Sequence, residues 1–399
     1  MHPGPVTPAD QTEATPSRII AVLGLGRMGT AMATRLASLG WEVTGWTRSG
    51  RIADSVQTVS DPGDAVAKAD VVLLALFDGP ACMQVLDRAR PSLRPGSIVV
   101  NTSTIAPAEA AALSSQLGTS YVHAPVLGSV PAATGGTLEI LAGASAVALA
   151  RVRPVLEALG RVRTVDDAAT AAALKLIANS SLAGAVFALR DSLRQGDVLG
   201  LPPARVLDVL ELGALGGLVT AKRSFLAGKP PPAEFTITAL GKDMALLAGT
   251  SMSPLRSAAE LADSPADPDA DFTVAATVPA PGDDVLDPLR AYIRGHATGD
   301  PAHFREAFLP TAHIEGIRNG TFISWDLDDY CALFGGQPDP DEPARSRRID
   351  AVDVHGTVAT ASMTLWHGAD TFTDVFLLVH ADGRWRIANK AYHRRHASS

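Results

Sequence analysis

Apolar and polar positions in the first 165 residues follow two alternating periodicities. Segments 30–39 and 106–117 repeat apolar residues with helical spacing, and short apolar runs lie on either side of them. Strands that alternate with helices are typical of βαβ units on a parallel sheet. We therefore predict an α/β Rossmann domain over residues 18–166. Its expected strands are at 18–23, 42–46, 70–76, 97–102 and 121–127.

The pattern changes after residue 166, where helical spacing continues without strands. Residues 168–199 form a stretch that is rich in alanine and leucine and contains no proline. Such a stretch is long for a helix of a globular protein and suits a connection between two domains. Further helical patterns follow at 203–212, 215–227 and 238–248. We predict an all-α helical domain over residues 167–264.

Two segments have the composition of irregular chain. Residues 265–284 are rich in proline and aspartate, which predicts a linker between domains. Residues 1–17 are rich in proline, threonine and alanine, and have neither a basic start nor an apolar run. They predict a disordered tail and not a signal peptide.

Strand periodicity returns in the last third of the chain. A helical start at 288–298 precedes four runs in which apolar and polar residues alternate, as in half-buried antiparallel strands. We predict a separate α+β domain over residues 285–396. Its expected strands are at 349–354, 358–366, 371–380 and 385–393.

Composition and charge exclude several classes of partner. The 399 residues carry a formal net charge of −8 and no block of lysine and arginine, so we expect neither nucleic acid nor an anionic membrane as a main partner. No window approaches about 18 apolar residues without polar interruption, which predicts no membrane span. The two cysteines predict neither a disulfide framework nor a zinc site. We expect a soluble cytoplasmic protein.

A glycine motif stands between the first expected strand and the following helix. The first glycine of G-x-G-x-x-G permits a tight turn, the second lets the backbone approach a pyrophosphate, and the third lets helix and strand pack closely. The N-terminus of the helix then holds the phosphates of a dinucleotide. The motif with its intervening residues is Gly24, Leu25, Gly26, Arg27, Met28 and Gly29.

The end of the second expected strand indicates which nicotinamide cofactor binds. Thr47, Arg48 and Ser49 lie there, Arg51 is close behind, and no carboxylate precedes Asp54. An acidic residue at this place would bind the ribose of NAD, whereas an arginine and two hydroxyls suit a 2′-phosphate. The sequence therefore predicts NADPH, and the alternative is a solvated loop arginine.

Several ordered motifs now resemble one family, the β-hydroxyacid dehydrogenases, which include 3-hydroxyisobutyrate dehydrogenase. The resemblance covers residues 18–278 and implies a hydride transfer between NADPH and a carbonyl or 3-hydroxy acid of the semialdehyde type. It also implies a homodimer whose helical domains intertwine. The segments that carry it are GLGRMGTAMATRL (24–36), WTRS (46–49), NTSTIAPAE (101–109), HAPVLGSVPAATGGTLEILAGA (123–144), LKLIANSSLAG (174–184) and EFTITALGKDMALL (234–247).

The resemblance implies roles for the polar residues of these motifs. Lys175 and Asn179 are four residues apart and share a helix face, with Lys175 as general acid/base and Asn179 positioning the substrate. Ser103 would contact the substrate, and Thr104 the nicotinamide ribose. The alternatives are an exposed lysine that extends along the helix surface, and a helix N-cap formed by the two hydroxyls before Pro107.

Other motif positions would line the same site. The resemblance places Leu76, Phe77 and Lys242 against the cofactor, and Gly128 and Ser129 at the substrate. For Lys242 the alternative is an exposed lysine on a helix. No resemblance implies a metal.

The sequence also departs from the family pattern. Leu127 replaces a small hydroxyl residue beside the expected substrate, His123 replaces an aspartate, and Arg190 stands at a usually acidic position. The small carboxylate typical of family substrates therefore does not follow. Imine reductases share the fold but usually carry aspartate or tyrosine at the position of Lys175, so C=N reduction is the second hypothesis. A cofactor-binding module without turnover is the third.

Residues 285–396 resemble a different family, the nuclear-transport-factor-2-like or SnoaL-like proteins in their lumazine-binding branch. The resemblance implies a cone of curved antiparallel sheet wrapped by helices, with a structural or dimerising role. We expect no metal, because no pair of side chains shows metal-ligand spacing. The carrying segments are YIRGHATGDPAHFREAF (292–308), AHIEGI (312–317) and FTDVFLLVHADGRWRIANKAYH (372–393), and the residues expected to line a pocket are His296, His313, Asp326, Asp374 and His380.

Overall fold

The computed structural model divides the chain into two units, which are described separately. The first unit consists of the chain up to Leu261 together with Asp267–Ala276. The second unit consists of Ala262–Ala266 and the chain from Thr277 onward. The tail predicted at 1–17 and the candidate Arg51 lie outside the described residues. The structure describes residues 19–50, 56–226, 230–251, 256–262, 264, 266–277, 283–318 and 320–396.

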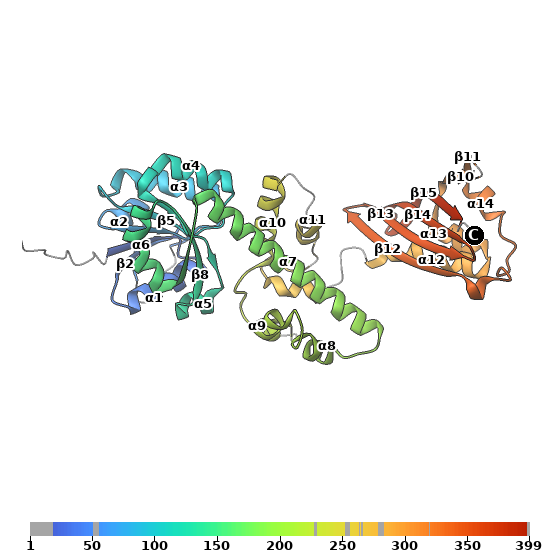
Figure 1. Ribbon diagram of the computed structural model, residues 1–399, viewed down its shortest axis with the longest axis horizontal. Helices are drawn as coiled ribbons and strands as arrows, with labels where there is room; N and C mark the ends of the chain where they lie inside the picture. The colour runs from blue at the N-terminus through green and yellow to red at the C-terminus, as the bar shows by residue number, and fades with distance from the viewer. Residues whose placement is uncertain are drawn as a thin grey trace, which may run out of the picture. The chain divides into compact units, whose positions relative to one another are not determined.

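The first unit contains the predicted parallel sheet. Its strand order is β3-β2-β1-β4-β5-β6-β8-β7, with β9 paired to β8, and the pairs from β3 to β6 are parallel. The predicted Rossmann fold is therefore confirmed (Figure 1). The strands are β1 (Ile19–Leu23), β2 (Glu42–Trp46), β3 (Gln57–Val59), β4 (Val71–Leu74), β5 (Ile98–Asn101), β6 (Tyr121–His123), β7 (Val126–Leu127), β8 (Leu138–Gly143) and β9 (Gly160–Val165).

Helices cover both faces of this sheet, because alternate strand residues enter two separate cores. On β1, Ile20 and Val22 pack with residues of α1 and α6, whereas Ala21 and Leu23 pack with residues of α2, α3 and α4. All of them are buried, as expected for strands of a doubly covered sheet. The helices are α1 (Arg27–Ser38), α2 (Pro62–Val66), α3 (Gly79–Ala89), α4 (Pro107–Leu117), α5 (Val130–Gly135) and α6 (Ala146–Leu159).

A long helix, α7 (Ala168–Val198), leads from the sheet to the other helices of this unit (Figure 1). The Asp167 carboxylate caps it by accepting a hydrogen bond from the Thr170 amide at 2.7 Å. Length and hydropathy alone would let α7 cross a bilayer, a test that core helices also pass. Its first turns contribute Ala168 and Ala172 to the core beneath the sheet. The helices that follow are α8 (Pro203–Leu210), α9 (Gly216–Leu226), α10 (Ile237–Ser251) and α11 (Arg256–Ala262).

The prediction of a linker over residues 265–284 is partly wrong. Asp267–Ala276 belongs to the first unit, and its Phe272–Ala276 part forms a 3₁₀ turn with a buried Phe272 side chain. The Phe272 amide donates to the Phe235 carbonyl at 2.9 Å, and Thr236 pairs with Asp271 in a β-bridge. Proline and aspartate gave this stretch the composition of a linker, but its buried side chains attach it to the helices.

The second unit is a twisted sheet with helices against it. Its strand order is β11-β10-β15-β14-β13-β12, and all pairs are antiparallel except β10 with β15. Inward residues such as Phe376 and Leu378 pack against Leu289 and Phe304. The predicted α+β fold is confirmed. The elements are α12 (Leu286–Thr298), α13 (Pro301–Ala307), β10 (Phe308–Arg318), β11 (Thr321–Asp326), α14 (Leu327–Cys331), β12 (Ser346–His355), β13 (Val358–His367), β14 (Asp370–Ala381) and β15 (Arg384–His396).

Candidate active site

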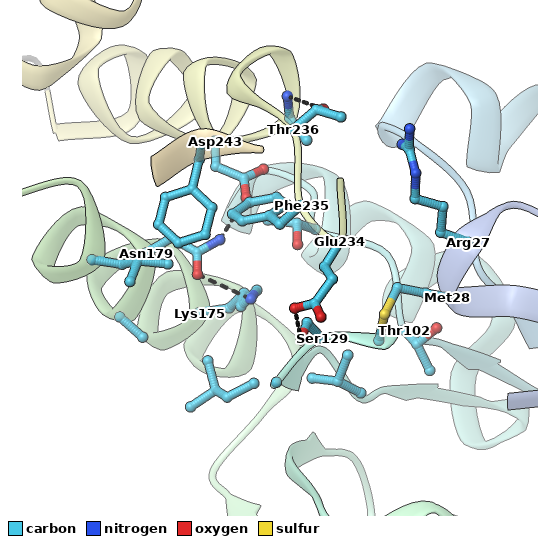
Figure 2. A pocket seen from close by; sticks show the side chains of 18 of the residues that line it. Arg27, Met28, Thr102, Ser129, Lys175, Asn179, Glu234, Phe235, Thr236 and Asp243 are labelled. Carbon is cyan, nitrogen blue, oxygen red and sulfur yellow. Dashed lines mark hydrogen bonds between the residues drawn. The ribbon is translucent and has the colours of Figure 1, made fainter. Parts of the chain in front are cut away.

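A cavity of about 830 Å³ lies in the first unit, between the carboxyl ends of the sheet strands and helices α7, α9 and α10. Ligands of open α/β sheets bind at this edge. Figure 2 shows part of its lining. The predicted site residues that line the cavity are Gly26, Arg27, Met28, Leu76, Phe77, Ser103, Thr104, Gly128, Ser129, Lys175, Asn179 and Lys242.

The glycine loop has the geometry that a dinucleotide needs. Gly24 has a φ of +109°, and a Cβ there would lie 2.4 Å from the Ala75 carbonyl oxygen. A Cβ on Gly29 would lie 1.9 Å from the Gly24 carbonyl oxygen, whereas one on Gly26 would meet nothing within 4 Å. The outer two glycines are thus required by packing, and the middle one leaves open space beside the N-terminus of α1. That terminus has neither a side-chain cap nor an acidic residue in its first turn, which suits a phosphate.

The end of β2 is open to solvent. Arg48 and Ser49 are exposed and Thr47 is half-buried, and none of the three lines the cavity. Among the described residues, no side chain pairs with Arg48. Gly24 and Leu25 both donate their amides to the Trp46 carbonyl, which joins this strand end to the glycine loop.

Lys175 and Asn179 face the cavity from one side of α7, as predicted (Figure 2). The Lys175 ammonium donates to the Asn179 Oδ1 at 3.0 Å, and the Asn179 amide donates to the Asp243 Oδ2 at 2.5 Å. All three side chains are buried. The alternative of a surface lysine on α7 is therefore wrong.

Burial changes the acidity of this lysine. Removal from water disfavours the cation and lowers the pKa of Lys175 to about 8. The Asp243 carboxylate opposes this shift, and the Lys242 ammonium adds to it. A group with a pKa near neutrality exchanges protons readily in both directions. The site thus contains a buried amine that can act as acid or base.

Lys242 joins the helical part to the sheet. Its ammonium donates to the Thr104 carbonyl at 2.7 Å, contacts the Asp243 Oδ1 at 2.7 Å and lies 5.4 Å from the centre of the Phe77 ring. The side chain is 16% exposed, so the alternative of a solvated helix lysine is wrong. The sequence motif did not single out Asp243. This residue contacts Lys242 directly, and it also contacts Asn179, the hydrogen-bond partner of Lys175.

Ser103 connects two strand ends. Its hydroxyl accepts a hydrogen bond from the Leu76 amide at 2.9 Å, beside the cavity. The alternative of an N-cap formed by Ser103 or Thr104 is wrong, because α4 begins after Ala106, whose amide donates to the Glu109 carboxylate at 2.8 Å.

A second polar cluster, which sequence reasoning missed, lines the cavity near Ser129. The Ser129 hydroxyl donates to the Glu234 Oε2 at 2.9 Å, and the Lys222 ammonium donates to the same oxygen at 2.9 Å and to the Asp271 Oδ2 at 3.0 Å. Figure 2 shows Glu234 reaching toward Ser129. Three separate segments supply these charges, so no local spacing signals them.

In the second unit, only two of the five predicted pocket residues lie inside the fold. Asp374 is buried, and its Oδ2 forms an ion pair with the Lys390 ammonium at 2.9 Å. The His296 Nε2 and the Tyr330 hydroxyl share a hydrogen bond of 3.0 Å. Burial lowers the pKa of Lys390 and lowers that of His296 well below its usual value. The other three lie nearer the surface: His313 and Asp326 are exposed register partners on β10 and β11, and His380 is half-buried against Trp385.

Comparisons with known proteins agree with both units. Residues 280–393, in the second unit, match the family described as "Putative lumazine-binding". Residues 19–170 match the NAD binding domain of 6-phosphogluconate dehydrogenase.

Relatives of the first unit include dehydrogenases. The "Probable 3-hydroxyisobutyrate dehydrogenase" of Mycobacterium tuberculosis is 32% identical over 206 residues, which are 49% of this chain and 70% of that one. The NAD-dependent L-serine dehydrogenase of Pseudomonas aeruginosa is 35% identical over 156 residues, which are 36% of this chain and 51% of that one. A structure of the M. tuberculosis 3-hydroxyisobutyrate dehydrogenase with L-serine has a TM-score of 0.57 and 26% identity, covering 65% of this chain and 97% of that one. The chain belongs to the 3-hydroxyisobutyrate dehydrogenase family of β-hydroxyacid dehydrogenases, and its second unit matches the putative lumazine-binding family.

Proposed function

We propose that the first unit catalyses reversible hydride transfer between NADPH and a carbonyl compound, with Lys175 as general acid/base. The observation that carries the proposal is the buried Lys175 ammonium, with a pKa lowered to about 8, in the same cavity as the N-terminus of α1. 3-Hydroxyisobutyrate and L-serine, named for the relatives, both carry a primary alcohol, the reduced form of an aldehyde.

The residues present fit a nicotinamide dinucleotide. The open space beside Gly26 and the uncapped first turn of α1 would receive the pyrophosphate, since free N–H groups and the helix dipole favour anions. Arg48, with Thr47 and Ser49, would hold the 2′-phosphate of NADPH, and Phe77, Thr104 and Lys242 would line the nicotinamide side. When bound, the nicotinamide supplies or accepts the hydride.

The chain's own residues would handle the proton. In reduction, protonated Lys175 donates to the carbonyl oxygen as negative charge develops there, while Asn179 orients the lysine through the hydrogen bond to its Oδ1. Asp243 fixes the Asn179 amide from the other side. Ser103 would help to position the substrate from the end of β5.

The proposal also covers the assembly and the location of the protein. We propose a homodimer, because apolar side chains are exposed at the end of α7, in the connection to α8, and on and just after α8, where a second copy would cover them. These side chains are Val198, Leu199, Leu201, Val209 and Leu212. A cytoplasmic location is proposed from composition alone.

The test compares the pH dependence of the two directions. With Lys175 as the proton carrier, kcat for carbonyl reduction falls as the pH rises through about 8, and kcat for alcohol oxidation rises over the same interval. Lys175→Met lowers kcat in both directions by roughly 10² to 10⁴ without changing the Kd of NADPH.

The control is Lys68→Met, which changes an exposed lysine outside the cavity and retains the parent activity. Normal turnover by Lys175→Met contradicts the proposed function. So does a kcat that rises with pH in both directions, or that falls with pH in both directions.

A further inference from the structure

The cavity extends along α7 well beyond Lys175. Several residues of α7 line it, and their spacing of three and four positions places them on one face of the helix. An α-helix advances about 1.5 Å per residue, so Ala185 lies roughly 15 Å farther along the helix axis than Lys175. The lining residues of this face are Lys175, Ala178, Asn179, Ser181, Leu182 and Ala185.

The later part of this face leads away from the sheet. Ala168 and Ala172, in the first turns of α7, belong to the core beneath the sheet, and the helix runs from there to the other helices of the first unit (Figure 1). The proposed cofactor contacts at the glycine loop and at the strand ends therefore lie on the sheet side of Lys175. We call Ser181, Leu182 and Ala185 the far wall, and this wall is left for the substrate.

A short hydroxy acid would cover little of the far wall. An extended chain advances about 3.5 Å for every three bonds, so a three-carbon compound bound at Lys175 reaches only about 4 Å. At the same rate, the distance from Lys175 to Ala185 corresponds to roughly a dozen bonds. The length of the cavity therefore suits a substrate with a longer chain.

The far wall presents hydrocarbon to the cavity. Leu182 and Ala185 have no polar side-chain group, and the Ser181 hydroxyl donates its proton to the Ala178 carbonyl at 3.0 Å within the helix. An apolar lining binds hydrocarbon, because covering it removes apolar surface from water. Residues of α9 that also line the cavity without a polar side chain are Gly217, Leu218 and Ala221.

The charged residue that α9 contributes to the lining already has partners. The Lys222 ammonium contacts the Glu234 Oε2 at 2.9 Å and the Asp271 Oδ2 at 3.0 Å, and it lies 4.3 Å from the centre of the Phe225 ring. A buried cation with such partners is compensated inside the protein. Binding of an uncharged chain along α7 would therefore leave no unpaired charge at Lys222.

We propose that the substrates are alcohols and aldehydes with a linear apolar chain of up to about ten carbon atoms, which lies along the far wall. This inference rests on the proposed function of Lys175. In the oxidation, the C–H bond of the alcohol breaks and its hydride passes to the oxidised nicotinamide. The O–H proton passes to neutral Lys175, and the aldehyde results. The assignment concerns the chain, and the loop at Gly128 and Ser129 stays available to a polar substituent beside the reacting carbon.

The experiment uses the full chain with NADPH and three linear aldehydes, namely propanal, hexanal and decanal. Burial of one methylene group favours binding by about fourfold, so we expect kcat/KM to rise roughly fiftyfold from propanal to hexanal and to rise further for decanal. Leu182→Asp places a charge on the far wall and lowers the ratio of kcat/KM for decanal to that for propanal by about tenfold or more. Ala185→Leu keeps the wall apolar but fills its end, and lowers the ratio of decanal to hexanal.

The matched control is Ile177→Asp, which introduces the same charge at an exposed position of α7 that does not line the cavity. This variant keeps the parent ratio of decanal to propanal. An unchanged ratio in Leu182→Asp, or an equal loss in Ile177→Asp, contradicts binding of the chain along the far wall.

Calorimetric binding of propanol and decanol to the complex with NADP⁺ separates this inference from the proposed function. Decanol binds more tightly than propanol, both to the parent protein and to Lys175→Met, because the far wall does not depend on the proton carrier. Equal affinities for the two alcohols, as expected if a second copy of the chain covers the far wall, overturn the inference. Normal turnover by Lys175→Met overturns only the proposed function.

Discussion

Replacement of Lys175 by methionine is expected to make the first unit more stable. The pKa of Lys175 falls from 10.5 to about 8 on folding, so keeping the cation in the buried site costs about 3 kcal/mol, at roughly 1.4 kcal/mol for each pKa unit. Methionine has a similar shape and needs no proton. It forfeits the 3.0 Å hydrogen bond to Asn179, which contributes about 1 kcal/mol. The free energy of unfolding should therefore rise by about 2 kcal/mol at pH 7.

The pH dependence gives this prediction its sign. Below about pH 8 the lysine is protonated in both states, and the whole cost of burying the cation is present. Between about 8 and 10.5 the unfolded chain keeps the proton and the folded chain releases it, so the cost declines. Above 10.5 the lysine is neutral in both states, and the advantage of methionine disappears.

The assay is urea unfolding of the full chain at several pH values, with the transition of the first unit identified by its shift on adding NADPH. Lys68→Met, at an exposed position, should show no gain that depends on pH. A destabilised Lys175→Met protein at pH 7, or a gain that stays constant up to pH 10, would refute the reasoning.

Three further predictions concern the cofactor and the two units. Arg48→Asp should weaken binding of NADPH relative to NADH by about 2 kcal/mol or more, and equal effects on both cofactors in a binding titration would exclude a 2′-phosphate contact. Gly29→Ala should lower Tm because its Cβ would lie 1.9 Å from the Gly24 carbonyl oxygen, whereas Gly26→Ala should keep Tm and weaken cofactor binding, since it meets no protein atom within 4 Å. Equal losses of Tm would contradict this account of the loop. A chain ending at Thr277 should fold alone and retain NADPH binding, because every residue of the cavity precedes it; an insoluble fragment would show that the first unit depends on the second.

Local patterns were sufficient for much of the fold and for one side of the site. The glycine motif and the spacing of Lys175 and Asn179 are properties of a strand-turn-helix and of a single helix face, and both are visible in a short stretch of sequence. Interactions between distant segments were not visible. Glu234 meets Ser129 across 105 positions of the chain, and no periodicity announces such a contact.

Composition also led to a wrong prediction of a linker around Asp271, where tertiary packing decides whether a residue is buried. Asp271 lies in a stretch with the residues of a linker, yet it is 2% exposed and pairs with Lys222. A buried carboxylate with a lysine partner depends on the whole surrounding structure, so a compositional rule assigns it to solvent.

Different parts of the chain supply different walls of the cavity, and this has a consequence for redesign. Lys175 stands on the first turns of α7, which are anchored in the core beneath the sheet through Ala168 and Ala172. Glu234 and Phe235 come instead from the stretch that leads into α10, a different part of the chain. Exchange of this short stretch, in evolution or in a mutant library, can therefore change the substrate range while the helix that positions Lys175, the proposed proton carrier, stays the same.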